Sequence, residues 1–198
     1  MKQTAARLAA GCLVLLLFCC HRETQQTPAN FFSYQLSLSN DSLLNFETLK
    51  NNKASVFVFL APDCPLSQGY NLTLNALHAK FGSAGVGFYG VVAGDKYAKK
   101  EIDGFITQYR IDLPIVLDTE AHLAKFLGAT VTPEVFVVNS EGASVYQGAI
   151  DNWSPELGQH RTVITEHYLR DALNGFIQTG RVSVNRTKAT GCFIELGN

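Results

Sequence analysis

The chain has 198 residues, a formal net charge of -1, 46% hydrophobic residues and 17% charged residues. This length and composition allow one domain of ordinary size with a packed core, and they exclude a chain that is disordered throughout. The sequence has no stripe of Lys and Arg interleaved with aromatic residues, so we expect no nucleic-acid partner.

The first twenty residues differ from the rest of the chain. Lys2 and Arg7 precede an uninterrupted run of apolar or small residues from Ala9 to Cys20. Such a run is shorter than the about 20 residues that a membrane-spanning helix needs. Its length and its basic flank are typical of a signal peptide.

A lipid anchor is the second expectation for this region. An apolar run that ends in cysteine and is followed by a polar segment resembles a bacterial lipoprotein signal. The resemblance implies export to the cell envelope and a lipid on Cys20, with residues 1–20 as the signal and 21–30 as a tether. A plain secretory signal or a short anchor with incidental cysteines remains the alternative.

Residues 31–178 are predicted to form the folded domain, beginning with a loosely alternating edge strand at Phe31–Ser39. Ser55–Leu60 is an uncharged run of β-forming residues, which is typical of a strand buried on both faces. A helix follows, because apolar residues recur every three or four positions from Leu66 to Phe81. Val86–Ala93 is predicted to be the next strand.

The second half of the domain continues this alternation. We predict helices at 102–109, 123–127 and 162–178, and strands at 113–117, 134–139 and 143–150, the last two forming a hairpin. The order is βαβα, a small βα insertion, then ββα. It predicts an α/β fold with a mostly parallel sheet and an antiparallel closing hairpin. Residues 179–198 are read as a largely polar C-terminal tail carrying Cys192.

The candidate nucleophile is Cys64, which lies where a buried strand gives way to a helix. Free N–H groups and the helix dipole favour an anion there and lower a cysteine pKa from about 8.5. Ser67 is expected either to cap a free N–H or to hydrogen-bond the sulfur. Asp63 would raise the thiol pKa if its carboxylate faced the sulfur. A lone cysteine is otherwise usually a small buried hydrophobe.

Two segments carry a family resemblance. Phe59–Ser67 (FLAPDCPLS) and Thr130–Val137 (TVTPEVFV) resemble the two signatures of the thioredoxin-like redoxin family, which includes peroxiredoxin-like and membrane-tethered thioredoxin-like proteins. The resemblance implies a thioredoxin fold: three α/β/α layers, a mixed central sheet and a peroxiredoxin-like βα insertion. It also implies that Cys64 is the reactive cysteine and that Pro133 is a cis-proline shaping the substrate groove.

The sequence departs from the family pattern at two positions near Cys64. Ser67 stands where a C-x-x-C motif has its second cysteine, and Ala61 stands where peroxiredoxins have Thr or Ser. Cys192 lies in a short apolar island, Thr190–Ile194, and similar endings occur in redoxin-domain proteins. We therefore hypothesise that Cys192 folds back and resolves Cys64. A free or structurally paired Cys192 is the alternative.

These features together predict an extracytoplasmic thiol–disulfide oxidoreductase with Cys64 as nucleophile. Its expected partners are protein or small-molecule thiols and disulfides, with the membrane engaged through a lipid anchor. No cofactor is expected, because electrons would pass by thiol exchange. Three alternatives remain: a peroxidase, which Ala61 argues against; a Cu(I) metallochaperone, since thiolates suit that ion; and an inactive thioredoxin-fold binding module.

Overall fold

The computed structural model of the protein describes residues 28–195. The lipidation predicted at Cys20 and the signal peptide predicted at residues 1–20 lie outside the described residues. The tether predicted at 21–30 falls outside them except at its end, where a 3₁₀ helix, η1 (Pro28–Ser33), begins.

The described residues form a seven-stranded central sheet in the order β2-β1-β5-β4-β3-β7-β8. The strands are β1 Gln35–Leu38, β2 Leu43–Asn45, β3 Ala54–Phe59, β4 Val86–Ala93, β5 Ile115–Asp118, β7 Glu134–Asn139 and β8 Ser144–Gly148. Only the β3–β4 and β4–β5 pairs are parallel, while the other four pairs are antiparallel. The mixed sheet is confirmed. The prediction that it is mostly parallel is wrong, because β7 returns beside β3 without a crossover that would make the two strands parallel.

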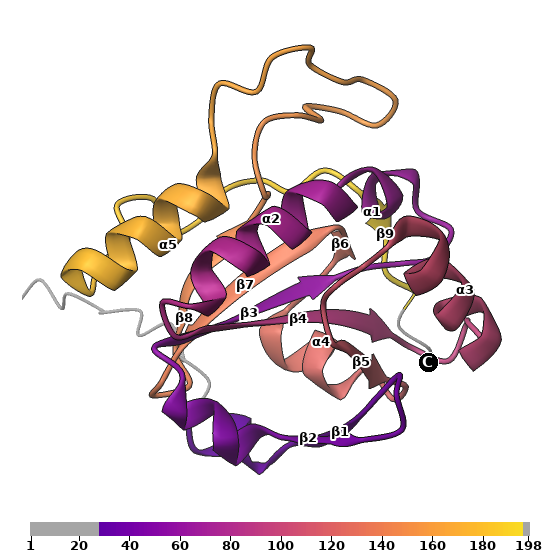
Figure 1. The fold of residues 1–198 in the computed structure, drawn as a ribbon, viewed down its shortest axis with the longest axis horizontal. Helices are drawn as coiled ribbons and strands as arrows, with labels where there is room; N and C mark the ends of the chain where they lie inside the picture. Colours follow the sequence, from indigo (N-terminus) through magenta and orange to yellow (C-terminus); the bar gives the residue numbers. More distant parts are fainter. Residues whose placement is uncertain (1–27, 196–198) are drawn as a thin grey trace, which may run out of the picture.

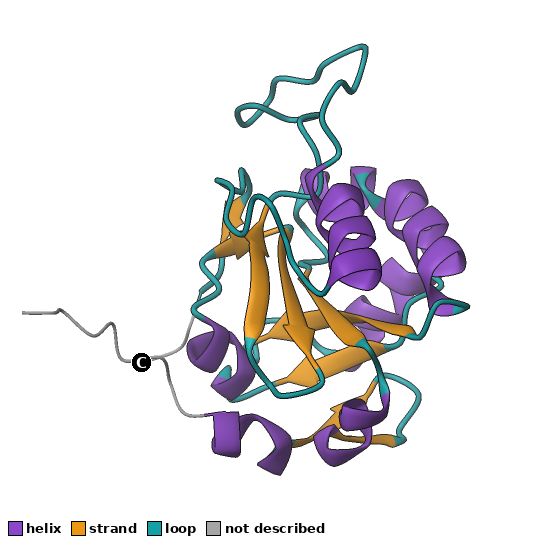
Figure 2. Ribbon diagram, turned by 90° about the vertical axis from the view of Figure 1, so that its left-hand side faces the viewer, coloured by secondary structure: helices purple, strands orange, loops and turns teal. Residues whose placement is uncertain are grey.

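Helices cover both faces of this sheet (Figures 1 and 2). They are α1 Pro65–Gly69, α2 Asn71–Gly82, α3 Lys99–Tyr109, α4 His122–Leu127 and α5 Tyr168–Thr179, with a second 3₁₀ helix, η2, at Phe46–Asn51. Apolar residues of α2, α3 and α5 form one core cluster with the sheet. Those of η1, η2 and α4 form a second cluster on the other face. The three-layer α/β/α fold is confirmed.

Strand β3 shows why both faces are buried. Val56 and Val58 belong to the first cluster, whereas Phe57 and Phe59 belong to the second, and all four are 0% exposed. Successive side chains of a strand point to opposite faces, so an unbroken apolar run fills both cores at once. The strand therefore ends at Phe59 in the middle of the sheet, where it delivers the loop that carries Cys64.

The N-terminal strand differs from its prediction. The segment predicted as an edge strand begins as η1, which buries Phe31, and only Gln35–Leu38 is extended. The strand is also internal, because β2 pairs with it and forms the edge. Asn40 makes the turn between them: its side-chain oxygen accepts the Ser42 N–H at 3.1 Å. An Asx side chain replaces a backbone partner in this way at many turns.

The long helix predicted from Leu66 to Phe81 is divided at Tyr70 into α1 and α2. The hydrogen-bond ladder nevertheless continues, since Tyr70 N donates to Leu66 O at 3.1 Å and Leu74 N donates to Tyr70 O at 2.9 Å. The predicted apolar stripe is therefore preserved, and it packs against the sheet.

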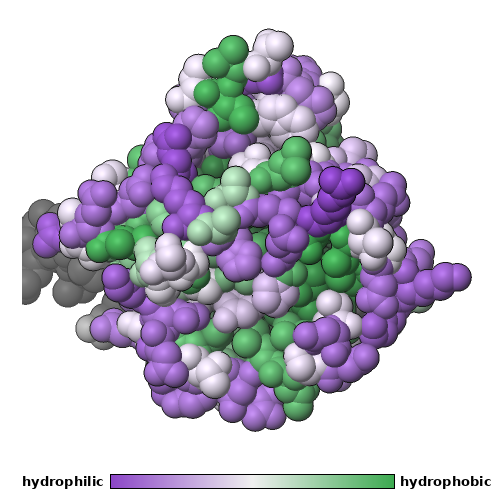
Figure 3. All heavy atoms as spheres, in the orientation of Figure 1, coloured by the Kyte–Doolittle hydropathy of each residue, from purple (hydrophilic) through white to green (hydrophobic). Residues whose placement is uncertain are grey.

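The last helix begins at Tyr168, later than predicted. Residues 162–165 are Thr-Val-Ile-Thr, whose branched side chains disfavour a helix. The Asn152 side-chain oxygen also accepts the N–H groups of Thr165 and Glu166 at 3.1 and 3.2 Å. Residues 151–167 instead form a loop that stands out from the domain (Figures 1 and 2), which we call the protruding loop. Hydrophobic atoms show on this loop in Figure 3, and its Leu157 and Val163 are exposed.

Candidate functional site

Cys64 lies between the end of β3 and the first turn of α1, as predicted. It is the N-cap residue of α1, with Pro65 in the first turn, and its side chain is 0% exposed. Its N–H donates to Ala61 O and its carbonyl accepts from Gln68 N, both at 3.1 Å. The sulfur is thus fixed by a tight loop at the point where free helix N–H groups converge.

Ser67 stabilises the loop that carries Cys64. Its hydroxyl oxygen accepts the Ala61 N–H at 3.1 Å, and the side chain is buried. Gln68 reinforces the turn by donating to the Pro62 carbonyl at 2.7 Å. Of the two roles expected for Ser67, its hydroxyl performs the capping role, while its backbone N–H is directed at the sulfur of Cys64.

The second signature lies directly against Cys64. The Thr132–Pro133 peptide bond is cis, and the Thr132 carbonyl is 3.0 Å from the Cys64 sulfur. Thr132 belongs to a short strand, β6 (Val131–Thr132), outside the central sheet. The fold therefore brings together two segments that are 68 residues apart in the sequence.

Cys192 lies beside Cys64. It begins a short strand, β9 (Cys192–Phe193), that pairs antiparallel with β6, and Thr132 is opposite Cys192 in the register. The Sγ atoms of Cys192 and Cys64 are 2.7 Å apart, and both cysteines are free. The two sulfurs are therefore in contact, close enough for a disulfide bond to form between them.

The chain before Cys192 is bound to the sheet, although we predicted only a polar tail there. Gln147 N donates to Asn185 O at 2.9 Å, and Thr187 N donates to Gln147 O at 3.0 Å. The Thr187 hydroxyl is 2.7 Å from the hydroxyl of buried Tyr146. The tail thus runs along β8 and then crosses to β6, as the yellow segment of Figure 1 shows.

Gly191 is the residue that allows the tail to reach β6. A Cβ at this position would lie 2.2 Å from the Thr132 carbonyl oxygen and 2.6 Å from its carbon. Because atoms cannot approach so closely, only glycine permits this approach. The glycine before Cys192 is therefore a second signal in the tail sequence, beside the apolar island, for the place where the tail docks.

The two cysteines have opposite pKa shifts. Burial acts to raise the pKa of Cys64, but hydrogen bonds from Cys192, the Thr132 side chain and the Ser67 N–H outweigh it, so the pKa is lowered. The Thr132 carbonyl can only accept a hydrogen bond, so it favours the protonated thiol and opposes the lowering of the Cys64 pKa. Burial, the hydrogen bond to Cys64 and the charge of Cys64 raise the pKa of Cys192. Cys64 is therefore the more acidic thiol of the pair, and Cys192 keeps its proton to higher pH.

Asp63 is directed toward Tyr97 and Lys96. The Tyr97 hydroxyl donates to its carboxylate, and Lys96 Nζ lies 3.1 Å from it. The hydrogen bond from Tyr97, with the help of Lys96, lowers the pKa of Asp63 against the effect of burial. Lys96 Nζ is also 3.4 Å from the Glu195 carboxylate. This ion-pair network, which the sequence did not reveal, connects the Cys64 loop to the tail just beyond Cys192.

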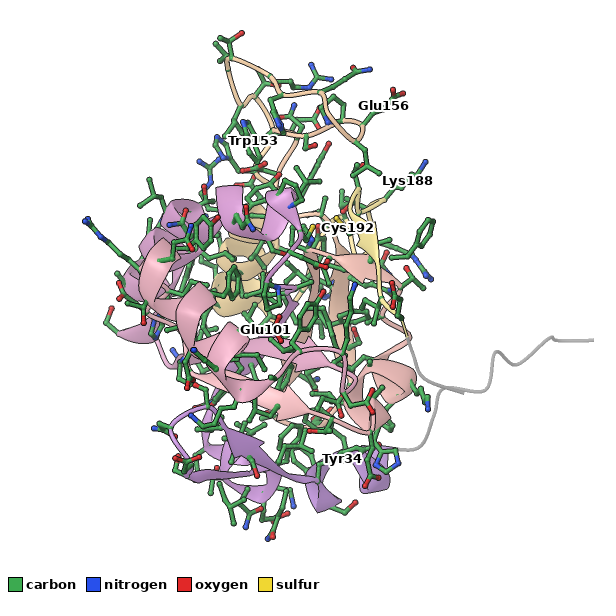
Figure 4. All side chains as sticks on the ribbon, turned by 90° about the vertical axis from the view of Figure 1, so that its right-hand side faces the viewer. Tyr34, Glu101, Trp153, Glu156, Lys188 and Cys192 are labelled. Atoms are coloured by element: carbon green, nitrogen blue, oxygen red, sulfur yellow. The ribbon has the colours of Figure 1, made fainter. Side chains whose placement is uncertain are left out.

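An apolar wall surrounds the two sulfurs. Tyr97, Trp153 and Cys192 pack around the buried cluster of Ala61, Cys64 and Leu66. Trp153 comes from the base of the protruding loop, above Cys192 in Figure 4. Its ring packs edge-on against Tyr70 at 5.0 Å. Gly69 leaves room for it, because a Cβ there would lie 2.6 Å from the indole.

Asp151 anchors the start of the protruding loop. Its carboxylate is buried and accepts hydrogen bonds from the Tyr70 hydroxyl at 2.7 Å and the Trp153 N–H at 2.8 Å. Burial and the hydrogen-bonded carboxylate of Asp151 raise the pKa of Tyr70. The loop base is thus fixed to the Cys64 helix by a buried polar contact.

Within residues 28–195, no three His, Cys, Asp or Glu side chains are grouped so that they could hold a metal ion. Nor does any helix in the described part of the chain have the length and apolar character needed to cross a membrane.

Comparisons with known proteins agree with this geometry. The Redoxin family model matches residues 24–159. A search of curated proteins found no match.

Three solved structures illustrate the similarity of fold. A hypothetical protein from Sinorhizobium meliloti 1021 is 21% identical with a TM-score of 0.73, over 83% of this chain and 91% of its own. A secreted Mycobacterium tuberculosis disulfide oxidoreductase homologous to E. coli DsbE is 15% identical with a TM-score of 0.52, over 74% and 96%. Xanthomonas campestris peroxiredoxin Q is 23% identical with a TM-score of 0.53, over 62% and 83%.

Proposed function

Because this chain belongs to the Redoxin family, we propose that it is an extracytoplasmic thiol–disulfide oxidoreductase with Cys64 as nucleophile and Cys192 as resolving cysteine. The observation that carries the proposal is the pair of sulfurs 2.7 Å apart with opposite pKa shifts. A thiolate is the attacking species in disulfide exchange, and the neighbouring thiol, Cys192, attacks in the second step.

The exchange proceeds in two balanced steps. The Cys64 thiolate attacks one sulfur of a substrate disulfide, forms a mixed disulfide, and releases the other substrate sulfur as a thiolate. Cys64 then carries no negative charge. One cause of the raised pKa of Cys192 is therefore removed. The Cys192 proton passes to the released thiolate. Cys192 attacks Cys64 Sγ, forming the Cys64–Cys192 disulfide and releasing the second substrate thiolate, so two electrons leave the protein.

An external dithiol returns the protein to its reduced state by the reverse exchange. The same chemistry run backward oxidises a substrate dithiol, and the redox poise of the compartment sets the direction. Ser67 supports both directions by closing the loop and directing its N–H at the sulfur. Pro133 follows Thr132, whose carbonyl contacts Cys64, and the proposal gives it the role of shaping the substrate groove.

The proposal includes export and a lipid at Cys20, so the partners are thiols and disulfides of proteins or small molecules outside the cytoplasm. The apolar run ending in cysteine supports this location. The similarity to a secreted disulfide oxidoreductase also supports it.

The test is mass mapping of both cysteines in a graded glutathione buffer. We expect a reversible Cys64–Cys192 disulfide in the wild-type protein. The Cys192→Ser variant should instead accumulate a glutathione mixed disulfide on Cys64. If Cys192 stays free in the wild type while Cys64 accumulates the mixed disulfide, the resolving role is wrong.

A hydroperoxide is the second candidate substrate, favoured by the structural similarity to peroxiredoxin Q. The thiolate would attack the peroxide, releasing an alcohol and leaving a sulfenic acid that Cys192 converts to the disulfide and water. Ala61 has no hydroxyl to bind the peroxide, so we expect this reaction to be slower than disulfide exchange. Stopped-flow rates with a peroxide and a peptide disulfide decide between them.

A further inference from the structure

Lys96 lies between the two chain segments that carry the cysteines. It belongs to the loop that joins β4 to α3. Its ammonium is 3.1 Å from the carboxylate of Asp63, the residue before Cys64. It is also 3.4 Å from the carboxylate of Glu195, which follows Cys192 by three positions. One cation therefore bridges the flanks of the two cysteines.

Strand β9 is too short to fix Cys192 by its pairing alone. It contains two residues and pairs with the two residues of β6. A two-stranded ribbon is at best marginally stable in water. The Thr190 hydroxyl holds the near end of β9, since it donates to the Pro155 carbonyl at 3.1 Å. The contact between Glu195 and Lys96 holds the far end.

The loop that carries Lys96 also meets the tail through its backbone. Gly94 has a φ of 81°, a conformation that side chains disfavour. A Cβ on it would lie 3.2 Å from the Glu195 carbonyl oxygen, closer than ordinary van der Waals contact. Glycine at this position therefore lets the loop approach the end of β9.

Lys96 also offsets a negative charge beside the cysteines. An unpaired carboxylate at Asp63 would disfavour a second negative charge nearby. Asp63 acts to raise the pKa of Cys192, and Lys96 acts to lower it. The hydrogen bond from Tyr97, with the help of Lys96, lowers the pKa of Asp63, so the carboxylate stays charged at neutral pH and the ion pair stays intact.

We propose that Lys96 is a positioning residue for the second step of the exchange, in which Cys192 attacks Cys64. Its ammonium bridges Asp63 and Glu195 and keeps the attacking sulfur in line with its target. The inference rests on the proposed function and deepens it by assigning a residue that sets the rate of closure. Because both ion pairs are exposed, dissolved salt screens them, and closure slows as the ionic strength rises.

The test separates the two steps by mixing the reduced, full-length chain with a neutral dipyridyl disulfide. The Cys64 thiolate attacks one reagent sulfur, forms a mixed disulfide and releases a pyridinethiolate, which takes up a proton as the absorbing thiopyridone. Cys192 then loses its proton to the buffer, attacks the Cys64 sulfur and releases a second pyridinethiolate. The rate of the first release depends on reagent concentration, whereas that of the second does not. A chain with Cys64→Ser and Cys192→Ser supplies the background from Cys12, Cys19 and Cys20.

Lys96→Met should slow the second release about fivefold, the effect of an ion pair at the upper end of those measured at exposed sites. The first release should stay near the wild-type rate. Lys96→Arg keeps the positive charge and should restore most of the closure rate. Glu195→Gln should also slow closure, and adding it to Lys96→Met should slow closure no further, because its partner is already lost.

Lys99→Met is the matched control. Lys99 is similarly exposed, but its ion pair with Asp103 lies within α3. This variant removes the same charge and should leave both releases at the wild-type rate. In about 1 M salt, where the Debye length is about 3 Å, the wild-type chain should close at the Lys96→Met rate, and Lys96→Met should be unchanged.

A pH profile distinguishes this electrostatic role from a merely structural one. The titratable groups around Cys192 include Cys64, Asp63, Lys96, Tyr97 and Glu195. The second release rises as the Cys192 thiolate forms. Its midpoint should therefore move to higher pH in Lys96→Met, where Asp63 is uncompensated, and stay in place in Lys99→Met.

Three outcomes would overturn the inference and leave the proposed function standing. The first is a second release in Lys96→Met with the wild-type rate and salt dependence. The second is a Lys96→Arg chain as slow as Lys96→Met, because the charge would then not carry the effect. The third is closure at the wild-type rate in Glu195→Gln. Absence of a second release from the wild-type chain would instead remove the proposed function itself.

Discussion

Gly191→Ala separates the two cysteines without altering either sulfur. The new Cβ would lie 2.2 Å from the Thr132 carbonyl oxygen, far inside the 3.4 Å at which ordinary van der Waals contact begins. Thr132 cannot retreat easily, because its carbonyl also contacts the buried Cys64 sulfur. The tail must therefore move away, and the pairing between Thr132 and Cys192 is lost.

The expected magnitude follows from that pairing. A hydrogen-bonded pair in an antiparallel ladder exchanges two backbone hydrogen bonds, each worth about 1 kcal/mol net. A loss of about 2 kcal/mol lowers the equilibrium constant for Cys64–Cys192 disulfide closure roughly 30-fold. The assay is redox titration against glutathione, with the disulfide fraction counted by mass.

Gly104→Ala is the matched control. Gly104 lies inside α3, and a Cβ there would have nothing within 4 Å. This variant should close the disulfide with the wild-type constant. The reasoning is refuted if Gly191→Ala also closes with the wild-type constant, because the tail would then reach Cys64 without the β6 pairing.

Three further predictions concern the sulfur, the loop and the anchor. Because the pKa of Cys64 is lowered, its thiolate is present above that pKa and lost as the pH falls through it. Ultraviolet thiolate absorbance should therefore titrate below the about 8.5 of free cysteine, and Cys192→Ala should raise the midpoint. Tyr70→Phe leaves the buried Asp151 carboxylate short of one donor, so chemical denaturation should show a loss of about 1–3 kcal/mol. Cys20→Ser should abolish incorporation of labelled fatty acid in cells.

Each of these has a control. If the thiolate titration midpoint of Cys64 is unchanged in Cys192→Ala, the assigned role of Cys192 as hydrogen-bond donor is contradicted. Tyr109→Phe removes a hydroxyl that accepts only from exposed Gln108, and it should alter stability by less than about 0.5 kcal/mol. Cys19→Ser should retain the lipid label. Persistence of the label in Cys20→Ser would show that the anchor lies elsewhere.

The local signals in the sequence located the fold and Cys64 well. The apolar run ending at Phe59 and the stripe from Leu66 to Phe81 depend only on neighbouring residues, and both elements are present. The hypothesis that Cys192 folds back was drawn from an apolar island in a polar segment. The structure brings the two sulfurs into contact, and the resolving role stays a prediction.

The features that the sequence did not reveal depend on contacts between residues that are far apart along the chain. Residues 185–187 attach to β8 through backbone groups and the Thr187 hydroxyl, so this attachment needs no apolar pattern. The edge strand β2 has only three residues, too few for a periodic signal. The network of Asp63, Lys96 and Glu195 joins three distant segments, and no spacing in the sequence encodes it.

The attachment of Thr187 to β8 has a consequence for the lifetime of a mixed disulfide. This attachment is separate from the β6–β9 pairing. If residues 191–194 are released from β6, Cys192 therefore remains tethered to β8 through the five residues that follow Thr187. Fully extended, five residues reach about 17 Å, which confines Cys192 to a small volume around Cys64. A short tether of this kind gives an effective concentration in the millimolar range or above. Under the proposed function, we therefore expect Cys192 to compete with free thiols and to release a captured substrate before a second thiol arrives.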